Sequence, residues 1–162
     1  MNARRSTVAV ILFLVAIAAG AAEPSPVTTV SFFVSARGMD RSRNLSEGDL
    51  RRIFLGEISR WPNGHRIVLY VRPFDSAAGR VFLDRLIRMS DIDYAQWWLG
   101  AVFRGRAAAA PRVMATPDSM SKAVAANADA IGFDSQTPDA ELLVLTIDGR
   151  APSDPRYAIR AR

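Results

Sequence analysis

Hydrophobic and polar positions follow two kinds of pattern along this chain. Four segments are rich in β-branched, aromatic or leucine residues and end at Pro, Gly or polar clusters, which is typical of β-strands. They are residues 27–35, 66–71, 130–133 and 142–147. Residues 66–71 are apolar almost throughout, which predicts a strand that is buried on both faces of a sheet.

Between these segments, apolar residues recur with the spacing of amphipathic helices. The clearest helix begins at Ser46, because Asp49 three positions later gives an acidic variant of the capping box. Its apolar residues follow at i, i+3 and i+4 and are Leu50, Ile53 and Phe54. Gly56 is placed to end the helix, since glycine readily adopts the left-handed conformation at a helix C-terminus.

Three further helices are predicted by the same signals. One occupies residues 77–89, one residues 91–105 after the N-cap Ser90, and one residues 117–127 after Thr116. Strands that alternate with helices are typical of an α/β domain. We therefore expect a central, mixed sheet flanked by about four helices.

The start of the chain has the pattern of a signal peptide. Arg4 and Arg5 precede an apolar run of about a dozen residues, and small residues follow as far as Ala22. The run is shorter than the ~20 residues of a membrane-spanning helix, although an uncleaved anchor is the alternative. We expect residues 1–22 to be removed and residues 23–162 to form one exported domain, most simply in the periplasm, that meets the membrane only during export.

Composition narrows the possible partners and chemistry. The chain has no cysteine, which excludes disulfides and thiol catalysis. Its formal charge is +5, and every basic residue except Lys122 is arginine. Arginine binds oxyanions in a bidentate manner, so the excess suits an anionic ligand, and it suits a solvated surface equally well. The arginines are spread singly and the chain is exported, so no nucleic-acid partner is expected.

Candidate chemistry lies at the junction between the strand at residues 66–71 and the helix at residues 77–89. Free backbone N–H groups at a helix N-terminus, together with a guanidinium, favour an oxyanion. The candidate ligand-binding residues are Arg72, Ser76, Ala77, Ala78 and Arg80. Arg72 would pair with the anion, Ser76 would donate its hydroxyl, and the next two N–H groups would complete the site. Alternatively, Ser76 only caps the helix, and Arg72 pairs with Asp75 or a surface carboxylate.

Several segments together resemble the periplasmic phosphate-binding proteins of ABC importers. Residues 53–64 (IFLGEISRWPNG) are similar to the IF-x-G and Trp segment of these proteins, and residues 130–133 (AIGF) to their late G-A-I-G-Y element. Residues 97–112, with WW, FRG and PR, and residues 148–157, with DG and PRY, resemble short exported relatives. The resemblance extends over about residues 27–159.

The resemblance implies one lobe of a type II periplasmic-binding-protein fold, since the family has two lobes and this chain suits about one. It also implies binding of phosphate or a related oxyanion in connection with ABC-type transport, with an ABC permease as a partner. The phosphate loop of the family is an Arg followed by Ser-Asp-Gly-Ser-Gly-Thr. Arg72 and Ser76 match this loop, whereas Ala77 replaces Gly and Ala78 replaces Thr. The Gly/Ser-rich loop of the other half-site is absent.

A second function stays open, namely a degenerate lobe without a ligand that acts as an envelope protein-interaction module. Trp97 and Trp98 would be interface anchors in such a module, although a place in the core explains them better. An enzyme is not expected, because His65 is the only histidine and cannot build a metal cluster or a nucleophilic triad by itself. No cofactor or metal is predicted.

Overall fold

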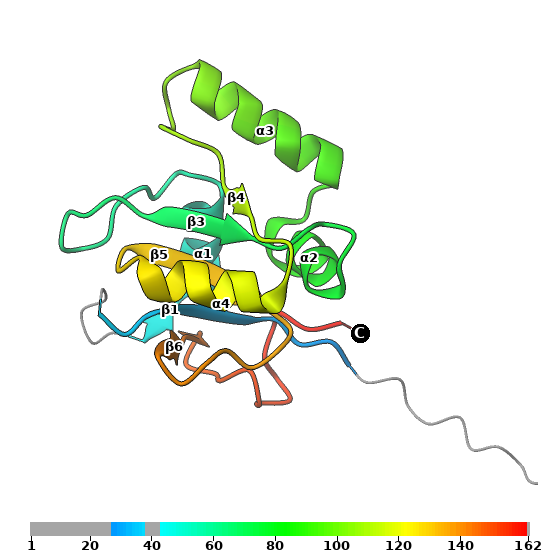
Figure 1. Cartoon of the computed structure of the whole chain (residues 1–162). Coiled ribbons are helices and arrows are strands. Elements are labelled where there is room, and N and C mark those ends of the chain that lie inside the picture. Colours follow the sequence, from blue (N-terminus) through cyan, green and yellow to red (C-terminus); the bar gives the residue numbers. More distant parts are fainter. Residues whose placement is uncertain (1–26, 38–42, 162) are drawn as a thin grey trace, which may run out of the picture.

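A computed structural model describes residues 27–37 and 43–161, and the predicted signal peptide at residues 1–22 lies outside them. The main strands are β1 (Ser31–Ser35), β3 (Val68–Val71), β4 (Arg112–Val113), β5 (Ala130–Asp134) and β6 (Leu142–Val144). They form one sheet in the order β4-β3-β5-β1-β6 (Figure 1). β3 runs parallel to β4 and β5, whereas β1 runs antiparallel to β5 and β6. The predicted mixed sheet of an α/β domain is confirmed.

The helices begin where the sequence predicts them. They are α1 (Glu47–Phe54), α2 (Ala77–Val81) with the π-helical turn η1 (Phe82–Ile87), α3 (Asp91–Phe103) and α4 (Pro117–Ala126). The side chains of Ser46, Ser90 and Thr116 each accept a hydrogen bond from the backbone N–H three residues later. These local caps fix the helix starts, because they satisfy donors that the helix itself leaves unpaired.

The helix predicted at residues 77–89 has two parts and ends at Ile87. In η1 the hydrogen bonds span five residues, and the last of them runs from the N–H of Arg88 to the carbonyl of Leu83. Arg88 has a φ of 58°, a left-handed conformation that ends the helix. All four apolar residues of this turn are buried, namely Phe82, Leu83, Leu86 and Ile87.

The prediction of a single strand at residues 142–147 is wrong, because the chain leaves the main sheet after Val144. Leu145 is fully buried, and its N–H donates to the carbonyl of Phe32. The next two residues form β7 (Thr146–Ile147), which pairs in parallel with β2 (Asn44–Leu45). Two-residue strands such as β2 and β4 are too short to show an alternating pattern in the sequence.

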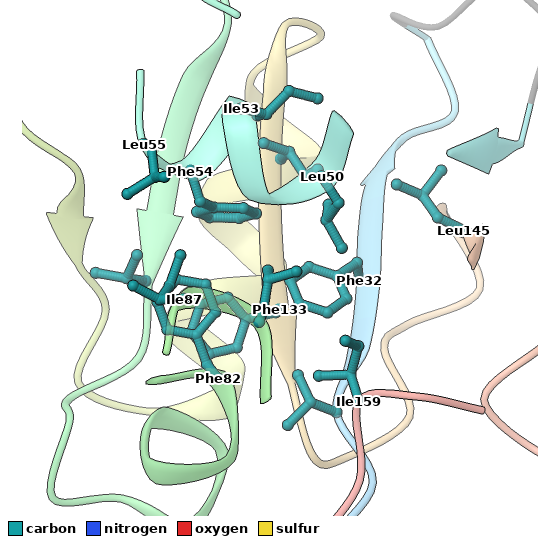
Figure 2. Packing of buried hydrophobic residues seen from close by; sticks show 14 of the residues in the cluster. Phe32, Leu50, Ile53, Phe54, Leu55, Phe82, Ile87, Phe133, Leu145 and Ile159 are labelled. Atoms are coloured by element: carbon teal, nitrogen blue, oxygen red, sulfur yellow. The ribbon is translucent and has the colours of Figure 1, made fainter. Parts of the chain in front are cut away.

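Four phenylalanines form the centre of the main core, between the sheet and the helices α1 and α2–η1 (Figure 2). Phe82 stacks on Phe133 with ring centroids 4.3 Å apart, and Phe54 meets Phe82 edge-on at 5.1 Å. Phe32 completes the group at 5.5 Å from Phe133. The rings join α1, η1, β1 and β5, so this cluster fixes how the α2–η1 segment lies on the sheet.

The opposite face of the sheet is covered by α4. Met120 and Val124 of this helix pack in a second cluster with Phe33 and Tyr70. Gly132 of β5 allows the close approach, because a Cβ atom there would lie 2.6 Å from the sulfur of Met120. The domain therefore has three layers, with helices on both faces of the sheet.

The helix α3 projects from this arrangement (Figure 1), and two of its side chains bind to the end of α1. The hydroxyl of Tyr94 donates to the carbonyl of Phe54 at 2.7 Å, and the indole N–H of Trp97 donates to the carbonyl of Leu55 at 3.0 Å. Trp98 is only 4% exposed, and Trp97 is half-buried against the core. The preferred core role of the two tryptophans is confirmed. None of the helices in the described residues is long and apolar enough to cross a membrane.

Candidate functional site

The carboxyl ends of β3, β4 and β5 meet at one edge of the sheet, because these three strands are parallel. Ligands of open α/β sheets commonly bind at such an edge. Arg72 follows β3, and its side chain connects the other two strand ends. Its Nη1 donates to the carbonyl of Met114, directly after β4, at 2.6 Å. Its Nε lies 2.8 Å from Oδ2 of Asp134, the last residue of β5.

Arg72 and Asp134 form a buried ion pair. The Nε–H is not aligned with Oδ2, so the contact is electrostatic and not a hydrogen bond. The other carboxylate oxygen, Oδ1, accepts the N–H groups of Ser135 at 2.7 Å and Gln136 at 3.2 Å. Arg72 therefore has a carboxylate partner, but this partner is Asp134 and neither Asp75 nor a carboxylate at the surface.

Ser76 caps α2 and its hydroxyl is engaged on both sides. The oxygen accepts the N–H of Gly79 at 3.0 Å, and the hydroxyl donates to the carbonyl of Pro73 at 2.5 Å. Gly79 is needed here, since a Cβ atom at this position would lie 2.1 Å from the carbonyl oxygen of Pro73. The loop thus folds tightly over the first turn of α2.

The backbone N–H groups of Ala77 and Ala78 are first-turn donors that the Ser76 cap does not use. Ala77 is exposed and Ala78 is buried. Arg80 is exposed too, and its Nη1 donates to the carbonyl of Asp75 at 2.5 Å. The first turn therefore holds N–H donors and a guanidinium, which is the chemistry that an oxyanion requires.

An open hollow of about 280 Å³ lies beside this turn. Its lining consists of Thr28, Ala77, Arg80, Val81, Asp84, Arg85 and Ala161. Two predicted site residues, Ala77 and Arg80, thus lie on one hollow, and Arg85 is a second cation there that the sequence analysis missed. Arg72 is not among the lining residues, because its guanidinium points toward the ends of β4 and β5.

The partners of Arg72 were also missed from the sequence. Asp134 follows the predicted strand at residues 130–133, and Met114 lies in a segment without a predicted element. An aspartate at the end of a predicted strand is the one feature of the local sequence that points to the ion pair of Arg72 with Asp134. Finding it also needs the parallel pairing of β3 with β5, which joins residues about 60 positions apart.

The described part of the chain contains no group of three or more His, Asp or Glu side chains that could hold a metal ion. His65 lies in an exposed turn, and its Nδ1 is 3.0 Å from a carboxylate oxygen of Asp129. This histidine therefore lies at the surface in contact with Asp129, and it is not among the residues that line the hollow beside α2.

No protein-family model matches the chain, and no curated protein matches it. Solved structures do match. They include an ABC-type phosphate transport receptor from Vibrio cholerae, with a TM-score of 0.63 and 17% identity. A putative phosphate ABC transporter substrate-binding protein with bound phosphate from Clostridium perfringens has a TM-score of 0.65 and 14% identity. PstS from Borrelia burgdorferi has a TM-score of 0.63 and 16% identity.

These matches cover 83%, 83% and 84% of this chain but 54%, 53% and 55% of the respective receptors. The chain thus spans about half the length of each receptor, as expected for one of two lobes. The names of the first two describe a phosphate transport receptor and a putative substrate-binding protein. At these identities the similarity establishes the fold, and this chain has the fold of a single phosphate-receptor lobe of the type II periplasmic-binding-protein architecture.

Proposed function

We propose that this protein is an exported, periplasmic domain of the substrate-binding-protein type that binds phosphate or a related oxyanion in connection with ABC-type transport. The observation that carries the proposal is the first turn of α2, where Ala77 and the exposed cation of Arg80 line the same hollow. The shared fold with phosphate receptors supports it.

In this proposal the oxyanion lies in the hollow beside α2. The N–H group of Ala77 donates to its oxygens, and the partial positive charge of the helix N-terminus adds to the attraction. Ala78 is buried and does not line the hollow, so its N–H group reaches the anion only if the first turn of α2 opens. Arg80 and Arg85 provide two positive charges in the lining against one negative charge from Asp84. An anion of phosphate size is therefore favoured over a neutral ligand.

Arg72 and Ser76 contribute differently from what the sequence suggests. The charge of Arg72 is balanced by Asp134, and the hydroxyl of Ser76 already has a donor and an acceptor. A direct contact of either side chain with the anion requires the exchange of one of these internal contacts. Because only one lobe contributes, we expect a weak complex, with a Kd of about 1 mM.

Calorimetric titration with inorganic phosphate and sulfate tests the proposal. Arg80→Ala should weaken phosphate binding at least about fivefold, since it removes a charge-assisted contact. Arg60→Ala is the matched control, because Arg60 also donates from Nη1 to a nearby loop carbonyl, that of Gly64 at 2.7 Å, but lies away from the hollow. The control should bind like the wild type.

A nuclear magnetic resonance titration locates the anion. The amide signals of Ala77 and Ala78 should shift with added phosphate in the wild type and shift less in Arg80→Ala. Absence of heat and of amide shifts at about 10 mM phosphate, well above the expected Kd, would overturn the proposal. Binding that is equally weakened by Arg60→Ala would show a diffuse attraction of anions to the basic surface.

A degenerate lobe that serves as an envelope interaction module is the second candidate function. The observation that favours it is that the two residues that match the phosphate loop, Arg72 and Ser76, already contact other groups of the protein. This candidate predicts no phosphate-dependent change in the amide signals of α2, so the same titration separates the two functions.

A further inference from the structure

A cavity of about 140 Å³ lies between α3 and the edge of β3 on which β4 pairs. β4 pairs with the last two residues of β3, so the first two, Val68 and Leu69, have no neighbouring strand on this side in the described part of the chain. Both residues line the cavity, together with residues 107–110, which lead toward β4. The cavity therefore occupies a place at the sheet edge where a strand neighbour ends.

The lining of this cavity is mostly apolar. All four residues of the segment 107–110 are alanine, and their short side chains leave the space beside β3 unfilled. Ile53, Ile67 and Trp98 also line it, and each of them is buried. An apolar cavity of ~150 Å³ is large enough to bind benzene. The volume here therefore suits an apolar group of about six carbon atoms.

Two arginines give the cavity a positive charge. Arg66 and Arg112 belong to its lining, which contains no acidic residue of the described chain. Both arginines are exposed, so they lie where the cavity opens to solvent. Neither forms an ion pair within residues 27–37 and 43–161. Their charges are therefore available to an anion, and a guanidinium binds a carboxylate in a bidentate geometry.

We propose that this cavity binds a small apolar carboxylate, whose apolar body enters the cavity while its carboxylate pairs with Arg66 and Arg112 at the opening. Benzoate is the probe that matches this description, because its ring has the size of the cavity and its charge is at one end. The ring of Trp98 in the lining suits an edge-to-face contact with a second aromatic ring. This site is separate from the hollow beside α2, since the two share no lining residue.

Other occupants fit the lining less well. Inorganic phosphate is polar on all sides, so burying it against apolar walls would cost hydrogen bonds that these walls cannot replace. Buried water needs about two to four polar partners, whereas most of this lining is apolar. A neutral apolar molecule would fill the space but would leave both guanidiniums without a partner. An apolar carboxylate is the class of ligand that uses both parts of the site.

Titration with benzoate tests the proposal, by calorimetry and by the indole N–H resonance of Trp98, which lines the cavity. We expect a Kd of about 1 mM, as is usual for a ligand of this size. Benzyl alcohol has the same ring without the charge and should bind at least about threefold more weakly. Acetate has the charge without the ring and should leave the Trp98 resonance unchanged.

Arginine variants test the charged part of the site. Arg66→Gln and Arg112→Gln should each weaken benzoate binding about threefold to tenfold and leave the binding of benzyl alcohol unchanged. Arg60→Gln is the matched control, because Arg60 is also exposed and its backbone forms a bridge with Arg66, but it does not line the cavity. Arg80→Ala in the hollow beside α2 should likewise leave benzoate binding unchanged.

A larger side chain tests the apolar part of the site. Ala107 lines the cavity and packs against the core, so a leucine at this position would take up part of the volume. Ala107→Leu should weaken the binding of both benzoate and benzyl alcohol at least about tenfold. Circular dichroism verifies that each variant is folded, and the arginine variants test the site independently of this substitution.

Four results would overturn the proposal. An unchanged Trp98 resonance at about 10 mM benzoate would show that the cavity takes up no such ligand. Equal affinity for benzyl alcohol and benzoate, or an equal loss in Arg60→Gln and the two lining variants, would show that Arg66 and Arg112 do not select a carboxylate. Benzoate binding that Arg80→Ala abolishes would assign the carboxylate to the hollow beside α2.

Discussion

The Nε atom of Arg72 lies 2.8 Å from Oδ2 of Asp134, and this contact joins the carboxyl end of β3 to that of β5. Both side chains are at least nine-tenths buried. A buried charge that loses its partner is costly, whereas replacing both partners by apolar residues often is not. We therefore expect the stability of this end of the sheet to depend on both members of the pair being present.

Removing one member of this pair should destabilise the protein strongly. We expect Arg72→Met or Asp134→Leu alone to lower the free energy of unfolding by about 3–5 kcal/mol. The double variant should lose clearly less than the sum of the two, because no unpaired charge remains buried. Urea unfolding of the four proteins measures the coupling. Strict additivity of the two single effects would show that the ion pair is not the cause.

Removal of the two buried tyrosine hydroxyls should change the free energy of unfolding by different amounts. The hydroxyl of Tyr94 donates to the carbonyl of Phe54, whereas the buried hydroxyl of Tyr157 has no hydrogen-bond partner in the described residues. Tyr94→Phe should cost about 1–2 kcal/mol of unfolding free energy, because it leaves that carbonyl unpaired. Tyr157→Phe should be neutral or stabilising and is the matched control. Equal losses in urea unfolding would contradict this assignment.

Stability at high pH should depend on the same tyrosines. Burial holds the pKa of both the Tyr94 and the Tyr157 phenol well above the usual value near 10. A raised pKa in the folded state means that this stabilising contribution is complete below about pH 10 and declines as the pH rises further. We expect the phenolate absorbance of these residues to appear together with unfolding, followed by circular dichroism. Ionisation of both in a folded protein at pH 10 would contradict the prediction.

Two glycines near helix N-termini should give opposite effects when replaced by alanine. At Gly79 the new Cβ atom would lie 2.1 Å from the carbonyl oxygen of Pro73, so the loop over α2 must move. We expect a loss of about 2–3 kcal/mol, as for an overpacked site. At Gly48 of α1 the nearest atom is the hydroxyl of Ser46 at 3.8 Å. Gly48→Ala should stabilise the protein by up to about 1 kcal/mol, because alanine favours the helix.

Thermal unfolding of both glycine variants checks this pair of expectations. A neutral Gly79→Ala would show that the loop containing Arg72 and Ser76 adapts easily. In that case the close contact between Gly79 of α2 and the carbonyl of Pro73 is not what holds this loop in place.

The local elements follow directly from the sequence. Ser46, Ser90 and Thr116 start their helices because each cap is completed within three residues, and Gly56 follows α1 with a φ of 73°. Strands β3 and β5 arise from short apolar runs whose side chains need burial. The start of α2, where the candidate oxyanion site is proposed, was predictable for the same reason, since the Ser76 cap is also a local feature.

Tertiary structure alone decided which of these groups meet. The parallel pairing of β3 with β5 brings Asp134 to Arg72, and the bend at Leu145 divides the last predicted strand into β6 and β7. The sequence of α3 shows apolar residues on both sides but does not say which side the domain covers. Capping and periodicity act over a few residues, whereas these contacts depend on partners tens of positions away. The sequence therefore determined the elements of this protein, and the packing of the sheet determined the partners of its charges and the helix face that remains exposed.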